Sequence, residues 1–114
     1  MNRFVLALAF AGLSGPAAAH AFLERAHPAA GEKLRAAPAE LELHFSEALE
    51  PVFSGVTVTD AAGADMSAGP AAASGAEMDL PLKALKPGRY RASWHAVSVD
   101  THRTEGKYDF LVLP

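Results

Sequence analysis

Two features of this sequence could bind a metal ion, and each contains one of its five histidines. The first is Asp100-Thr101-His102. On a strand, residues two apart point to the same side, about 6.6 Å apart at the backbone, so this carboxylate and imidazole could converge on one ion. The alternative is an exposed pair of loop residues. The absence of cysteine excludes disulfides, thiolate zinc sites, Fe–S clusters and thiol catalysis.

The second feature is His20, provided that it becomes the first residue of the mature chain. Residues 1–19 have the pattern of a secretory signal peptide, with a cationic start, an apolar run and an alanine-rich end. The run is too short for a membrane span, which needs about 20 apolar residues. Cleavage after Ala19 predicts an exported chain of residues 20–114 with a free amine on His20. A competing cut after Ala21 would remove this histidine.

The amine nitrogen and Nδ1 of an N-terminal histidine can close a chelate ring on a metal ion. At neutral pH an ordinary α-amine, with a pKa of about 7.7–8.0, is partly deprotonated. A nitrogen of His102 and an oxygen of Asp100 would complete a tetragonal set of N and O ligands, the set that Cu(II) prefers. If His20 instead frays in solvent, as most chain ends do, no such site forms.

Short strands must position these residues. Apolar and polar residues alternate over 40–45, 55–59, 89–99 and 107–113, and Gly/Pro turns separate these segments. Helical periodicity is weak throughout. The Ala/Gly-rich residues 60–76 predict a long connection with an edge strand. The chain is therefore expected to be all-β, a Greek-key β-sandwich of about seven strands.

Length and charge narrow the classes of function. A chain of 114 residues suits a single domain. With 13 Asp and Glu against 10 Lys and Arg, the net charge of −3 argues against a nucleic-acid-binding protein. There is no nucleophile elbow and no glycine-rich phosphate loop. The expected core comprises Phe22, Leu34, Leu41, Leu43, Phe45, Phe53, Val56, Val58, Leu80, Leu82, Leu85, Tyr90, Trp94, Tyr108, Phe110 and Val112.

Several motifs are spread along the expected mature chain. His20 directly follows the signal peptide, and the others are PAAG at 28–31, PAELELHFSE at 38–47, LKPGRY at 85–90, and WHAVSVDTH at 94–102 followed by Gly106. Together they resemble the CopC family of periplasmic copper-binding proteins over essentially the whole mature length. The joint pattern is far more specific than any one piece.

This resemblance implies an Ig-like sandwich that holds one Cu(II) at one end. Carried over by residue, His20 supplies its amine and imidazole, His102 an imidazole and Asp100 a carboxylate. Glu47 matches a position implicated near the same site in some members, where a carboxylate could orient a ligand, hold a water or bind weakly along the axis. The alternative for Glu47 is a solvated turn acid. His44, on the polar side of the segment 40–45, is expected either to hydrogen-bond near the site or to lie at the surface.

The resemblance also implies a periplasmic, non-enzymatic and monomeric protein that acts in copper homeostasis or resistance. A possible partner is an inner-membrane copper transporter present as a separate chain. Some family members carry a methionine-rich loop that suits Cu(I). Because residues 60–79 here contain only Met66 and Met78, we expect no Cu(I) site.

Two other classes of function stay open. One is a copper oxidase that attacks polysaccharides, since such enzymes also use an N-terminal histidine chelate. They are usually larger and need a flat surface of exposed aromatic side chains, whereas this chain has two Tyr and one Trp. The other is a metal-free Ig-like domain for assembly or adhesion, whose stability Cu(II) should not change.

Overall fold

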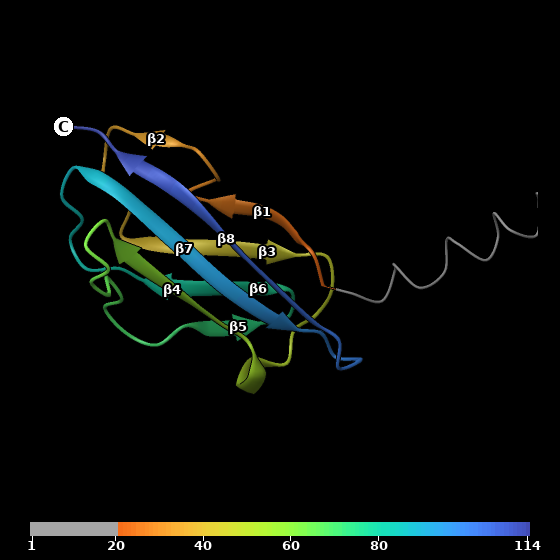
Figure 1. Ribbon diagram of the computed structural model, residues 1–114. Helices are drawn as coiled ribbons and strands as arrows, with labels where there is room; N and C mark the ends of the chain where they lie inside the picture. Colours follow the sequence, from red (N-terminus) through yellow and green to blue (C-terminus); the bar gives the residue numbers. More distant parts are fainter. Residues whose placement is uncertain (1–20) are drawn as a thin grey trace, which may run out of the picture.

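The computed structural model describes residues 21–114, in which strands form two four-stranded sheets (Figure 1). The strands are β1 (Leu23–His27), β2 (Lys33–Leu34), β3 (Glu40–Phe45), β4 (Gly55–Asp60), β5 (Ala72–Ser74), β6 (Glu77–Pro81), β7 (Gly88–Val97) and β8 (Arg103–Val112). Their order is β1-β3-β6-β5 in the first sheet and β2-β8-β7-β4 in the second. The expected all-β sandwich is confirmed. The described residues contain no α-helix, and none of their helical turns could cross a membrane.

Strand β3 shows how the sequence pattern builds the first sheet. Its bounds are those of the alternating segment, and Leu41, Leu43 and Phe45 are buried while the residues between them lie on the outer face. Strand β5 forms the edge of this sheet, so the edge strand expected within residues 60–76 is confirmed. Alternation of apolar and polar residues was sufficient to predict these strands, because each strand has one buried face.

Strands β7 and β8 form a long antiparallel hairpin in the second sheet. The pairing runs without a shift from Gly88 opposite Val112 to Val97 opposite Arg103. Strand β7 ends before Val99, and β8 begins well before Lys107, the start of the alternating segment. The first part of β8 has no apolar alternation, because hydrogen bonds to β7 and not side-chain burial define it. The residues between Val97 and Arg103 therefore form a loop.

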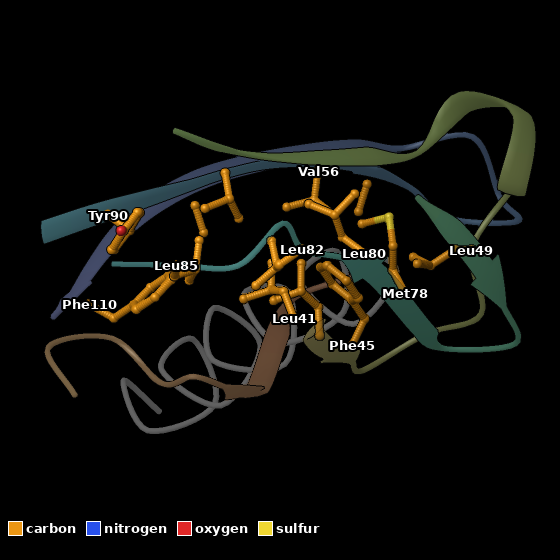
Figure 2. Close-up of a cluster of buried hydrophobic side chains, with 14 of the residues drawn as sticks. Leu41, Phe45, Leu49, Val56, Met78, Leu80, Leu82, Leu85, Tyr90 and Phe110 are labelled. Carbon is orange, nitrogen blue, oxygen red and sulfur yellow. The ribbon is translucent and has the colours of Figure 1, made fainter. Parts of the chain in front are cut away.

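Apolar side chains of both sheets fill the space between them. Figure 2 shows Leu41, Phe45 and Leu80 among this cluster, with Val56 from the facing sheet. Most of the expected core is confirmed, but Phe22 and Phe53 are 49% and 62% exposed. The prediction was wrong for these two because Phe22 precedes β1, and Phe53 lies in the 3-10 turn η2 (Pro51–Phe53), outside the sandwich. Their apolar character alone could not show this.

Gly106 of β8 lies directly opposite Trp94 of β7, whose ring meets Phe45 edge-on with centroids 5.2 Å apart. A Cβ at position 106 would lie 2.8 Å from Trp94 Cζ2. We therefore expect Gly106→Ala to lower the free energy of unfolding by about 1–3 kcal/mol, as overpacking does. Urea unfolding measures this loss. In a Trp94→Leu background the same change should cost much less, and an equal cost in both backgrounds would contradict the explanation.

Candidate metal centre

The loop between β7 and β8 brings Asp100 and His102 together. Asp100 Oδ2 lies 3.4 Å from His102 Nδ1, and the two side chains are 44% and 54% exposed. Of the two arrangements considered from the sequence, the structure has the exposed loop and not the shared strand face, because residues 98–102 turn between the two strands. Thr101 has a φ of 73°, the left-handed conformation that tightens this turn. An exposed loop thus juxtaposes a carboxylate and an imidazole.

The buried residue Ser98 fixes the conformation of this loop through hydrogen bonds. It is 1% exposed, and its hydroxyl donates a hydrogen bond to Asp100 Oδ1. Its amide donates to the His102 carbonyl at 3.0 Å, and its own carbonyl accepts from the Thr101 amide at 2.8 Å. A buried side chain and two backbone bonds therefore fix the orientation of the exposed Asp100 carboxylate.

The electrostatics of the loop keep Asp100 ionised. The hydrogen bond from Ser98, followed by that from His102, holds the pKa of Asp100 below its ordinary value. A carboxylate with a lowered pKa stabilises the folded state above its ordinary pKa, and this contribution is lost as the pH falls through the lowered value. At neutral pH Asp100 is therefore available as an anionic oxygen ligand.

We expect Ser98→Ala to raise the pKa of Asp100 towards its ordinary value, because the largest cause of the shift is then removed. A pH titration of the Asp100 carboxyl carbon by NMR, in metal-free protein, measures this change. Thr101→Ala is the matched control, since the Thr101 hydroxyl donates to the Asp100 backbone carbonyl and not to its carboxylate. An unchanged pKa in Ser98→Ala would contradict the assigned role of the hydroxyl.

The start of the described chain is anchored at the same end of the sandwich. Ala21 is fully buried, and its carbonyl accepts a hydrogen bond from Thr104 Oγ1 at 2.6 Å. The Phe22 amide donates to Ser46 Oγ and the Ser46 amide donates to the Phe22 carbonyl, both at 2.8 Å. His20, the expected chelating residue, lies outside the described residues. Its neighbour Ala21 contacts Thr104, which lies two positions after His102.

The segment that contains Glu47 runs along the β7–β8 loop (Figure 1). The Val99 amide donates to the Ala48 carbonyl at 3.2 Å, and Leu49 forms a β-bridge with Ser98. Glu47 itself is partly buried. Three segments that are distant in sequence, beginning at residues 21, 46 and 98, therefore meet at one end of the molecule.

Sequence reasoning missed two residues that build this end, Ser98 and Thr104. Small hydroxyl residues close to charged ones look like surface residues, and the only local signal was a serine two positions before Asp100. Ser98 forms a β-bridge with Leu49, which helps to bury it, and the Thr104 hydroxyl donates a hydrogen bond to the Ala21 carbonyl. Both contacts are long-range, so only the folded chain reveals them.

A family model described as the CopC domain matches residues 23–113. The chain belongs to the CopC family. The resemblance drawn from the sequence motifs is thereby confirmed, and the two sheets described above are those of a CopC domain. The match covers the β7–β8 loop and the segment with Glu47.

Named relatives extend over nearly the full length of this CopC chain. It is 39% identical to Protein YobA of Escherichia coli (strain K12) over 115 residues, which cover 96% of this chain and 93% of that protein. It is 36% identical to Copper resistance protein C of Pseudomonas syringae pv. tomato over 124 residues, 98% of each. The crystal structure of CopC from Methylosinus trichosporium OB3b is similar with a TM-score of 0.77 and 32% identity, over 83% of this chain and 95% of that one.

Proposed function

We propose that this CopC-family chain binds one Cu(II) at the end of the sandwich that carries the β7–β8 loop. The ligands are the amine and imidazole of His20, the imidazole of His102 and the carboxylate of Asp100. Glu47, on the adjacent segment, orients a ligand or binds weakly. Membership in a family of copper resistance proteins makes the chain a copper-binding protein and not an enzyme, which removes the copper oxidase alternative.

One observation carries this proposal: the bond from Thr104 to the Ala21 carbonyl. Consecutive Cα atoms are only about 3.8 Å apart across a trans peptide. A mature chain that starts at His20 therefore begins one residue from a buried anchor, beside the strand that follows His102. The fraying that could have prevented a terminal site is opposed by the burial of Ala21.

The donor set suits Cu(II). An amine, two imidazoles and a carboxylate are N and O ligands that can lie in one plane, and Cu(II) has the highest affinity among the divalent first-row ions for such sites. Asp100 is the anionic member, and its lowered pKa keeps it deprotonated. Protons compete with the metal for the nitrogen ligands, so the affinity should fall in acid.

The two methionines of the described region support a site for Cu(II) alone. Met78 is fully buried, and Met66 packs against the same core. Soft thioether ligands favour Cu(I), but these two side chains pack in the core and against it. We therefore propose no Cu(I) site.

The biological role that we propose is copper homeostasis or resistance in the periplasm. Export would remove residues 1–19 and create the free amine on which the site depends. The protein, as a monomer, would buffer one Cu(II) or pass it to an inner-membrane copper transporter present as a separate chain. The exposure of Asp100 and His102 supports exchange with such a partner.

Copper binding to residues 20–114 tests the proposal. Cu(II) at 100 times its Kd should raise the free energy of unfolding by about 2.7 kcal/mol, because the ligand binds only the folded state. Intact mass of the exported protein with its metal should show a chain that starts at His20 and carries one copper ion. No change in stability would favour the metal-free assembly or adhesion domain, and a mass that starts at Phe22 would exclude the amine ligand.

A further inference from the structure

A second group of possible metal ligands lies on the outer face of the first sheet. Within residues 21–114, Glu42, His44 and Glu77 each offer one ligand atom, and these atoms lie within 4.8 Å of one another. His44 Nε2 is 3.9 Å from Glu42 Oε1, and His44 Nδ1 is 3.7 Å from Glu77 Oε1. The imidazole of His44 therefore lies on the outer face of its own sheet, close to one carboxylate of β3 and one of β6.

Strand register explains the convergence. Glu42 and His44 are two residues apart on β3, so both point outward while Leu43 between them is buried. Strand β6 pairs antiparallel with β3 and places Glu77 opposite His44 and Asp79 opposite Glu42. The side chains of opposite residues lie close together on one face. Regular strands thus hold this group, unlike the loop that carries Asp100 and His102.

An unpaired oxygen lies on the same face. Asp79 Oδ1 is buried and has no hydrogen-bond partner, although a buried carboxylate oxygen ordinarily has one. The pKa of Glu77 is raised because its protonated form can donate a hydrogen bond to the Asp79 carboxylate, and because the two negative charges repel each other. Glu42 and Asp79 both repel the charge of Glu77, and a cation held beside Glu77 would offset this repulsion.

A surface hollow gives access to the group. It has a volume of about 350 Å³, and its lining includes Glu24, Arg25, His44, Ser74 and Glu77. Arg25 is the one fully charged basic side chain among the lining residues, and it is exposed. The side chains of His44 and Glu77 are 28% and 41% exposed, so both can rotate towards an ion that enters from solvent.

We propose that Glu42, His44 and Glu77 form a second divalent metal site, separate from the terminal copper site. One imidazole and two carboxylates suit a borderline ion such as Zn(II), which takes N and O ligands at about 2.0–2.2 Å. One ligand atom from each residue lies within 4.8 Å of the others, whereas the edges of a tetrahedral shell at these ligand distances are about 3.4 Å. Rotation of the partly exposed side chains would draw the three atoms together around one ion. The site goes beyond the proposed function, because it shares no ligand with the terminal site and lies on the outer face of the first sheet.

Zn(II) titration of residues 20–114 carrying both His20→Ala and His102→Ala tests this site, since the terminal site then lacks both of its imidazoles and the histidine chelate. We expect the ring signals of His44 to shift in NMR spectra as Zn(II) is added. In the same background, His44→Gln and Glu77→Gln should each weaken Zn(II) binding at least tenfold by calorimetry. Thermal unfolding shows that each variant is folded.

His95→Gln is the matched control, because it removes a partly buried histidine from β7 of the opposite sheet. It should leave Zn(II) binding unchanged. The proposal is overturned if His44→Gln and Glu77→Gln bind Zn(II) as tightly as their parent, or if the His44 signals do not move. Either failure leaves the terminal copper site untouched, since Cu(II) binding there is measured separately with His102 intact.

Discussion

Replacing His102 by alanine is expected to remove most of the stabilisation that Cu(II) gives to residues 20–114. At 100 times the wild-type Kd this stabilisation is about 2.7 kcal/mol, so the loss should be of that size. Without metal, the variant should unfold within about 0.5 kcal/mol of the wild type, because the side chain is 54% exposed and lies in a loop. Thermal unfolding with and without Cu(II) measures both quantities.

The matched control for this prediction is His95→Gln, which changes a histidine on β7 outside the β7–β8 loop. It should keep the full effect of Cu(II). Asp100→Asn should weaken binding less than His102→Ala, because it removes an anionic oxygen but retains all the nitrogen ligands. Full stabilisation of His102→Ala by Cu(II) would show that the β7–β8 loop is not the copper site.

An extension of Gly-Ser-Gly-Ser before His20 is expected to weaken Cu(II) binding at least about tenfold, a loss of 1.4 kcal/mol or more. Four residues are used because a two-residue extension would make His20 the third residue of the chain, and a terminal X-X-His sequence itself chelates Cu(II). The extension converts the free amine into an amide and leaves the imidazole in place. Binding to the extended chain should also depend less steeply on pH, because one fewer nitrogen must lose a proton. Competition with a chelator of known affinity, measured across a pH series, gives both results.

The control for the extension is the same tetrapeptide added after Pro114, which changes the length without touching the amine. It should bind Cu(II) as the unmodified chain does. Equal affinity of the two extended chains would mean that the amine is not a ligand. The proposed chelate of the His20 amine and imidazole would then be wrong, and Cu(II) would need another set of ligands beside His102 and Asp100.

Much of the fold could be predicted from the sequence, and the particular strands show why. In β3 and β4, apolar residues alternate with polar ones, and the bounds agree closely with the alternating segments. The first part of β8 has no such alternation, because hydrogen bonds to β7 and not side-chain burial make this part a strand. Phe22 was misplaced for a related reason: an apolar residue does not reveal whether its position lies between the sheets or beyond their end.

For the candidate site, the sequence indicated the residues but not their geometry. From the sequence, Asp100 and His102 could share a strand face or lie in an exposed loop. The structure shows a turn, with Thr101 in the left-handed conformation, that brings them together. The buried hydroxyl of Ser98, which orients Asp100, had no sequence signal strong enough to predict it. Nor did the alternation of β3 indicate that His44 would face a carboxylate of β6.

By itself, the sequence determined the all-β class, most of the core and the CopC family, because these depend on local periodicity and on motifs readable along the chain. Only the tertiary structure decided that Ala21, Ser46 and Ser98 meet at one end of the sandwich. Contacts between residues tens of positions apart depend on strand register and on how two sheets pack. Those are properties of the whole folded chain, and no single segment encodes them.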